Sequence, residues 1–288
     1  MKGKFSTFLV LLAAILWGTK GSAQTFTPEN AHPIAVGTMR LAVGGGSLLF
    51  VALLLGQVNL KNWPIKATIL ASLSMAFYQP MFFSAVHITG VAIGTVIAIG
   101  SAPILAGVLE RVFLKRRLSK VWWYSTFLSI LGCTLLFINT GSVQVNPYGI
   151  LMALGAGLSF ASYAMVSEKL VKEHSSLSVI AIVFTLSAFL LLPFLFVYDM
   201  SWVTEARGLM VSLHLGIIAT GLAYFLFARG LIHTPSSTAV TLSLAEPLTA
   251  ALLGVFLVGE RLELLSWMGI SLLLVGITML IVSPKRSA

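Results

Sequence analysis

The sequence predicts an all-α membrane protein in which ten transmembrane helices form two inverted five-helix repeats. Its 288 residues are 58% hydrophobic and only 9% charged, which is too little charge for the surface of a soluble domain. The mean hydropathy of +0.98 points the same way. The apolar residues gather in separate segments, and the two halves of the chain align with one another at a constant offset. These three observations together indicate a duplicated membrane protein.

Ten apolar segments each have roughly the 17–25 residues that a transmembrane helix requires. They are Phe5–Phe26, Ala35–Gly56, Ala67–His87, Val91–Leu114, Val121–Thr140, Tyr148–Glu168, Ser178–Tyr198, Gly208–Gly230, Ser236–Gly259 and Ser266–Val282. The first also has the charge-then-apolar form of a signal peptide. Removing it would leave nine segments and break the repeat, so a spanning helix is favoured.

The repeat relates the fourth and fifth segments to the ninth and tenth. A shift of 144 positions places Pro103 on Pro247 and Trp123 on Trp267. The first repeat then covers residues 1–144 and the second covers residues 145–288. Since five is an odd number of helices, the second repeat enters the membrane in the opposite orientation. Inverted repeats are typical of secondary transporters with a substrate site near the midplane, although a duplication can also be purely structural.

The basic residues alternate between loops. One set of ends and loops holds Lys2, Lys4, Lys61, Lys66, Lys115, Arg116, Arg117, Lys120, Lys169, Lys172, Lys285 and Arg286, and the other set holds only Arg207 and Arg261. By the positive-inside rule both termini are expected in the cytoplasm, with the protein in the cell inner (plasma) membrane. The net charge of +9 is therefore read as a topology signal and not as a nucleic-acid surface.

Glu246 and Pro247 stand near the middle of the ninth segment. A carboxylate at that depth costs about 3 kcal/mol on insertion scales unless it is paired, protonated or facing water. The proline removes a backbone hydrogen bond and bends its helix. Ser243 lies one turn from Glu246 on the same helix side. We expect Glu246 to bind a cationic substrate group or a proton; the alternative is a buried acid that caps the backbone groups freed by Pro247.

Two cations lie in the first and second segments. Lys20 and Arg40 either line a substrate path, where Arg40 would bind a carboxylate, or extend their long side chains to the outer headgroups. The sequence leaves open whether one of them pairs with Glu246. The adjacent Glu110 and Arg111 are expected to form a local structural charge pair, and His214 is a weaker candidate for a proton relay.

Several aromatic and polar side chains lie well inside the segments and not at their ends. They are Tyr78 and Gln79, followed by Pro80, and Trp17, Tyr163 and Tyr224. Such rings can line a pocket for a ring or an ammonium group, or they can pack helices together. The prolines Pro103 and Pro247 are expected to bend the fourth and ninth helices, with a second kink at Pro80. The cavity is expected between the first, third, fourth, sixth, eighth and ninth helices.

The sequence resembles a known family. The segment LWGT in the first helix, an arginine early in the second, and SLAEPLTAALLGVFLVGERLELLSWMGISLLLVGI near the end are similar to the drug/metabolite transporter superfamily, in its EamA branch. The family pattern falls here on Trp17, Gly18, Arg40, Pro103, Glu246, Pro247, Glu260 and Gly276. Lys20 has no assigned position in that pattern. The resemblance implies export of amino acids, other metabolites or drug-like cations from the cytoplasm by alternating access.

We therefore expect a transporter and not an enzyme. The expected partners are a small-molecule substrate (an amino acid or organic amine), the lipid bilayer and, as one coupling mode, protons. No cofactor, metal or nucleic acid is expected, and the single Cys133 excludes an intrachain disulfide. A passive channel or facilitator is the main alternative. A membrane enzyme acting on lipid is disfavoured because no loop carries an acidic or histidine cluster.

Overall fold

The computed structural model describes residues 2–24, 26–28, 31–58, 61–137, 146–259 and 261–282, and within these ranges all regular structure is helical. The first half contains α1 (Lys2–Gln24), α2 (Pro33–Leu54), α3 (Ile65–Thr89), α4 (Val91–Phe113) and α5 (Lys120–Phe137). The second half contains α6 (Pro147–Glu173), α7 (Ser176–Leu191), α8 (Phe194–Val197), η1 (Ser201–Thr204), α9 (Ala206–Leu213), η2 (His214–Leu222), α10 (Ala223–Leu231), α11 (Ser236–Leu242), α12 (Ala245–Leu253), η3 (Gly254–Val258) and α13 (Leu264–Val282).

These elements confirm the predicted all-helical membrane fold. In the described part of the chain, nine helical segments are long and apolar enough to cross a membrane. The remaining helix, α1, has 23 residues and carries Lys2, Lys4 and Lys20. Local signals set some of the boundaries. The side chain of Asn146 accepts the N–H of Tyr148, and Pro147 occupies the first turn of α6, where its missing N–H has no cost.

Three of the predicted segments are composite. The seventh is interrupted before α8, next to Pro193, and the eighth runs through α9, the wide-turned η2 and α10. The ninth is divided into α11, α12 and η3. Wide π-type turns and proline breaks are common where helices serve a function beyond packing, because they free backbone groups and shift side chains.

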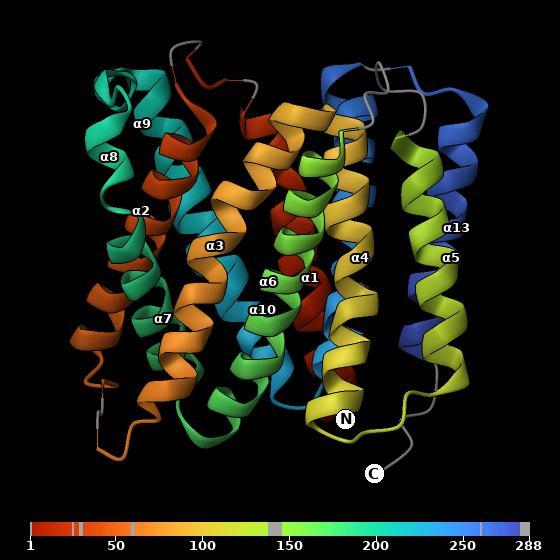
Figure 1. The fold of residues 1–288 in the computed structure, drawn as a ribbon, viewed down its shortest axis with the longest axis horizontal. Coiled ribbons are helices and arrows are strands. Elements are labelled where there is room, and N and C mark those ends of the chain that lie inside the picture. Colours follow the sequence, from red (N-terminus) through yellow and green to blue (C-terminus); the bar gives the residue numbers. More distant parts are fainter. Residues whose placement is uncertain are drawn as a thin grey trace.

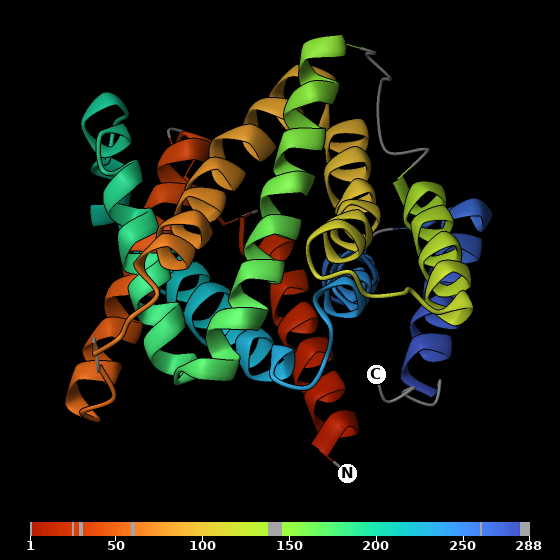
Figure 2. The ribbon, with the colours of Figure 1, turned by 60° about the horizontal axis from the view of Figure 1, so that its bottom comes forward.

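Figures 1 and 2 show how the helices are arranged. α5 and α13 form a pair at one side of the bundle (Figure 1). A Cβ atom added at Gly132 of α5 would lie 2.6 Å from the carbonyl oxygen of Gly269 in α13, so the two backbones are in direct contact. In the centre, α1 packs against α10 and α12, while α6 packs against α3 and α4.

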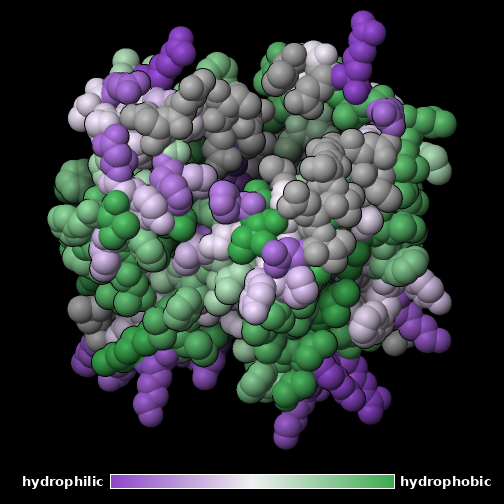
Figure 3. All heavy atoms as spheres, turned by 45° about the horizontal axis from the view of Figure 1, so that its top comes forward, coloured by the Kyte–Doolittle hydropathy of each residue, from purple (hydrophilic) through white to green (hydrophobic). Residues whose placement is uncertain are grey.

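The described chain begins and ends at the same end of the bundle (Figure 1). This end also holds the connecting residues 55–58, 61–64, 114–119, 174–175 and 232–235, and we call it the basic end because Lys61, Lys115, Arg116 and Arg117 lie there. Apolar residues dominate the sides of the molecule, and hydrophilic side chains extend from its two ends (Figure 3). This is the distribution that a bilayer around the sides requires. Lys285 and Arg286 lie outside the described residues.

Candidate functional site

Lys20 and Glu246 form an ion pair in the interior of the bundle. The Lys20 Nζ lies 2.7 Å from Glu246 Oε1, and the two side chains are 14% and 21% exposed. The same ammonium lies 5.8 Å from the centroid of the Trp17 ring, within the range of a cation–π contact. Lys20 therefore points into the bundle and does not extend to the headgroups.

The position of Glu246 follows from Pro247. Proline has no N–H to bond with the carbonyl four residues earlier, and here that carbonyl belongs to Ser243. The Ser243 carbonyl instead accepts the N–H of Glu246 at 2.9 Å, and the N–H of Leu244 bonds to the Thr241 carbonyl at 3.1 Å. The helix is interrupted at this point, and Glu246 lies in the first turn of α12. A carboxylate is stabilised there by the helix dipole.

The other two prolines do not interrupt their helices. Pro103 lies within the continuous α4, and Pro80 lies within the continuous α3. A single proline removes one hydrogen bond, and a helix can accommodate that loss without a break. The two repeats are therefore not equivalent at the aligned positions Pro103 and Pro247.

Gly18 brings α1 close enough for the ion pair to form. A Cβ atom at this position would lie 2.5 Å from the Cβ of Thr249 and 2.9 Å from the carbonyl oxygen of Glu246. Only glycine allows this approach of α1 to α12. The close contact at Gly18 brings α1 and α12 together, and the long Lys20 side chain reaches the Glu246 carboxylate from the same part of α1.

The ion pair forms part of a pocket between six helical segments. Its walls are Trp17 and Lys20 from α1, Tyr78 from α3, Ala98, Ile99 and Ala102 from α4, Phe160 from α6, Tyr224 from α10, and Val240, Ser243 and Glu246 from the ninth segment. These are the six segments between which the sequence predicts a cavity. The cavity volume is about 20 Å³, which is room for about one water molecule. A larger molecule enters only if the walls separate.

Aromatic rings form much of the wall. The Trp17 ring centroid lies 4.6 Å from that of Tyr224 and 5.8 Å from that of Phe160, and Tyr78 lies 5.9 Å from Phe160. Tyr163 lies behind this wall, fully buried, with its ring 5.7 Å from Tyr224 in an edge-on contact. Of the two roles considered for this ring, the structure therefore shows Tyr163 packing helices together and not lining the pocket.

Arg40 and Gln79 also lie outside the wall of the pocket, and both are buried. Their exposed fractions are 4% and 1%. Within the described chain, Nε and Nη2 of Arg40 and Nε2 of Gln79 have no hydrogen-bond partner. Arg40 does not extend to the headgroups; its charge interacts with those of nearby groups, including Lys20. Ser243 does line the pocket, and its hydroxyl donates to the Val240 carbonyl at 2.7 Å.

Five wall residues are absent from the sequence prediction. They are Phe160, Ala98, Ile99, Ala102 and Val240. Apolar side chains of these kinds occur throughout the spans, so no feature of the sequence separates them from residues that face lipid. A weak signal exists only for Phe160, which lies one turn before Tyr163.

The family is decided by comparison with known proteins. The model of the EamA-like transporter family matches residues 4–138 and, again, residues 147–282. The chain belongs to the EamA-like transporter family. It is 49% identical over 286 residues to "Uncharacterized transporter YwfM" of Bacillus subtilis (strain 168), covering 99% of this chain and 97% of that protein.

Two further similarities of this EamA-like transporter are more distant. It is 27% identical over 259 residues to the "Threonine/homoserine exporter RhtA" of Salmonella typhimurium (strain SL1344), covering 88% of this chain and 84% of that one. A crystal structure of a protein with 19% sequence identity matches 95% of both chains with a TM-score of 0.84, which shows a shared fold. Of the family-pattern residues, Glu260 lies outside the described residues.

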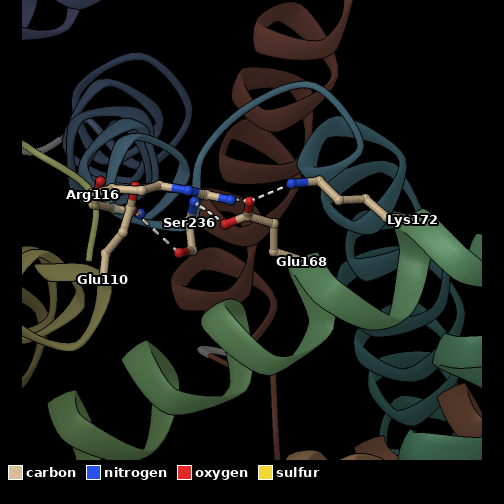
Figure 4. Close-up of polar contacts among 6 residues, drawn as sticks. Glu110, Arg116, Glu168, Lys172 and Ser236 are labelled. Atoms are coloured by element: carbon tan, nitrogen blue, oxygen red, sulfur yellow. Dashed lines mark hydrogen bonds and ion pairs between the residues drawn. The ribbon is translucent and has the colours of Figure 1, made fainter. Parts of the chain in front are cut away.

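A second charged cluster lies at the basic end of this EamA-like transporter (Figure 4). Glu168 Oε2 accepts the backbone N–H of Ser236 at 2.8 Å, and Glu110 Oε2 accepts that of Ser237 at 3.0 Å. Both carboxylates are almost fully buried. They satisfy N–H groups that the first turn of α11 leaves without helical partners. Two helices, α4 and α6, thereby hold α11 at this end.

Two cations neutralise these carboxylates. Arg116 Nη1 lies 2.7 Å from Glu168 Oε1 and 3.5 Å from Glu110 Oε1, and Lys172 Nζ lies 2.6 Å from Glu168 Oε1. Partial burial opposes the charged form of Arg116, but its hydrogen bonds and attraction to Glu168 and Glu110 outweigh this and raise its pKa. The expected local pair of Glu110 with Arg111 is wrong. The chain turn after α4 brings Arg116 back to Glu110, while Arg111 is exposed.

His214 is joined to α1 beside Lys20. The hydroxyl of Thr19 donates to the Leu16 carbonyl at 2.7 Å, so it accepts the Nε2 proton of His214 at 3.0 Å. No carboxylate of the described residues lies within ion-pair distance of His214. This hydrogen bond links η2 to α1. A proton relay through His214 stays a prediction.

Proposed function

We propose that this protein is a secondary transporter that exports amino acids or related small metabolites, including amines, from the cytoplasm by alternating access around the central pocket. We place it in the cell inner membrane with both termini in the cytoplasm. The observation that carries the proposal is the Lys20–Glu246 ion pair, enclosed by helices of both repeats. The similarity to a protein named as a threonine/homoserine exporter supports the substrate class.

The chemistry of the pair suits an amino acid. Separating two opposite charges inside a membrane is costly unless each gains a new partner. An amino acid supplies both, because its ammonium can bind Glu246 while its carboxylate binds Lys20. The rings of Trp17, Tyr78 and Tyr224 then offer an apolar and aromatic surface to the side chain. If transport is coupled to protons, Glu246 is also the group that would bind a proton in exchange for the substrate.

The alternation of access is proposed to use the break in the ninth segment. Glu110 and Glu168 hold the N-terminus of α11 at the basic end. The interruption at Ser243 and Leu244 separates this clamped helix from Glu246 in α12. Release of the clamp lets α11 move as a short rigid piece about that interruption, and occupancy of Glu246 biases the movement.

The test is uptake by the purified full-length protein in proteoliposomes, with labelled amino acids and organic amines, with and without an imposed pH gradient. Saturable and competed uptake supports transport, and acceleration by the gradient supports proton coupling. Uptake that only equilibrates the substrate under every gradient indicates a facilitator. No uptake of any compound by folded, inserted protein counts against the proposed substrate class.

Glu246→Gln tests the central residue. This variant is expected to insert and to lose transport or the pH dependence of transport. Glu205→Gln is the matched control, because Glu205 is exposed in the connection before α9 and its side chain forms no cap hydrogen bond. Normal transport by Glu246→Gln across the pH range contradicts the role of Glu246.

A further inference from the structure

Arg40 is a buried cation for which no ion pair is found among the described residues. It lies seven residues beyond Pro33, the first residue of α2, at a depth of about 10 Å along the helix. Its side chain is 4% exposed, and neither Nε nor Nη2 has a hydrogen-bond acceptor within the described chain. The guanidinium stays charged at any physiological pH. A buried charge of this kind in a membrane protein normally has a counter-ion.

The acid near Arg40, Glu246, already forms an ion pair with another cation. Glu246 pairs with Lys20 at 2.7 Å, and the charge of Arg40 interacts unfavourably with that of Lys20. Among the described residues, these three groups carry two positive charges and one negative charge. Water can accept the N–H groups of Arg40, but it cannot neutralise the remaining positive charge. The site therefore lacks one anion.

The hydrogen-bonding groups nearby show the same imbalance. The Nε2 of Gln79 and the Nε1 of Trp17 are buried donors without acceptors in the described chain. Gln79 lies against α2: its Oε1 is 3.1 Å from the position of a Cβ at Gly37, one turn before Arg40. Guanidinium, amide NH2 and indole N–H groups all donate, so the missing molecule must accept. A carboxylate supplies both the negative charge and the acceptors.

We propose that Arg40 and Gln79 form an anion subsite beside the Lys20–Glu246 pair, and that this subsite binds the carboxylate of the transported molecule. The inference rests on the proposed function and narrows it. Substrates carry a carboxylate, as amino acids and monocarboxylic acids do, and amines without a carboxylate are excluded. An ammonium group, where present, takes the place of Lys20 on Glu246, and the bound carboxylate then lies between Arg40 and Lys20.

Three compounds with the same apolar body separate the two charged groups. Leucine carries both, 4-methylpentanoate carries only the carboxylate, and isoamylamine carries only the ammonium. The melting temperature of the full-length protein in detergent is measured with each compound at millimolar concentration. Leucine and 4-methylpentanoate are expected to raise it, and isoamylamine is not. A rise with isoamylamine equal to that with the acids overturns the proposal, as does the absence of a rise with either acid.

An inorganic anion is the other source of the missing charge, and the same assay separates it. The comparison is sodium chloride, added at the same concentration to a buffer that otherwise contains no chloride. A rise as large as that produced by 4-methylpentanoate assigns the subsite to a small inorganic anion and overturns the substrate proposal. A clearly smaller rise supports recognition of the carboxylate with its apolar body.

Variants of Arg40 distinguish a binding role from a structural one. Arg40→Gln removes an unpaired buried charge, so the ligand-free melting temperature is expected to stay the same or rise, while binding of 4-methylpentanoate weakens about tenfold or more. Arg40→Lys keeps the charge and is expected to retain part of the binding. Arg207→Gln is the control, because Arg207 is exposed on α9. A large fall in the ligand-free melting temperature of Arg40→Gln, with its ligand-induced rise intact, contradicts the assignment.

Uptake measured with the same compounds separates the failure of this inference from the failure of the proposed function. Stabilisation by the acids without uptake of either would refute transport of these compounds and leave the subsite in place. Uptake of isoamylamine that matches uptake of leucine would refute the subsite and leave transport in place.

Discussion

Replacement of Glu246 by glutamine removes the only negative charge of the central ion pair at nearly constant volume. Loss of one partner of a fully buried pair costs about 3–5 kcal/mol. Here the two side chains retain exposures of 14% and 21%, so water reaches the remaining charge and the cost is smaller, about 2–3 kcal/mol. Lys20→Gln is expected to cost less than Glu246→Gln. It leaves Arg40 and Glu246 with opposite charges, whereas Glu246→Gln leaves two cations side by side.

The double variant Lys20→Gln/Glu246→Gln completes the comparison. Both charges are then absent, so its cost is expected to be below the sum of the two single costs by about 1–3 kcal/mol. The assay is thermal unfolding of detergent-purified protein. The measured quantity is the fraction of protein that stays monodisperse after heating to each temperature. At about 2–4 °C per kcal/mol, Glu246→Gln is expected to lower the melting temperature by roughly 4–12 °C.

Two results would contradict this reasoning. If the double variant loses as much stability as the two single variants together, Lys20 and Glu246 are not energetically coupled. If Lys20→Gln is the more damaging of the two single changes, the excess of positive charge around Arg40 is refuted. Glu205→Gln is expected to leave the melting temperature unchanged and reports any general effect of the glutamine substitution.

Three further changes test the surrounding structure. Gly18→Ala is expected to cost about 1–3 kcal/mol by pushing α1 away from α12. Gly46→Ala is the control: among the described residues, a Cβ atom there would meet nothing within 4 Å outside its own stretch of helix, so this change is expected to be neutral or stabilising in the same melting assay. Equal effects of the two changes contradict the close contact at Gly18. Glu168→Gln is expected to loosen the N-terminus of α11, so a cysteine introduced at Ser237 should react faster with a membrane-impermeant maleimide added at the basic end; an unchanged rate argues against the clamp. Pro247→Ala is expected to restore a continuous ninth helix, raise the melting temperature and lower uptake; a fully active, more stable variant shows that the interruption is dispensable.

The predicted segments agree with the helices because crossing a membrane is a local property. A run of apolar residues of sufficient length forms a helix in lipid whatever its neighbours are, since its backbone must bond within the segment. The kink at Pro247 was predicted for the same local reason. The interruption lies one turn earlier, at Ser243 and Leu244, because the lost hydrogen bond involves the carbonyl four residues before the proline.

The residues of the pocket were predicted less completely. Polar and aromatic side chains in an apolar span attract attention, and this led to Trp17, Tyr78, Tyr224 and the acid Glu246. Phe160 was missed because it resembles every other phenylalanine in the spans. Tyr163 lies behind the wall because the packing of α6 against its neighbours sets its rotation, and the sequence carries no direct record of that rotation.

The sequence by itself determined the membrane class, the spans, the resemblance to the family and the presence of an acid followed by a proline in the ninth helix, since each depends on hydropathy, on spacing along the chain or on a matching pattern. Only the tertiary structure decided that Lys20 and not Arg40 pairs with Glu246, and that Glu110 and Glu168 clamp α11. These contacts join residues that lie 68 or more positions apart in the chain, on helices whose lipid-facing and protein-facing sides are equally apolar. Partners of that kind are chosen by the packing of whole helices against one another.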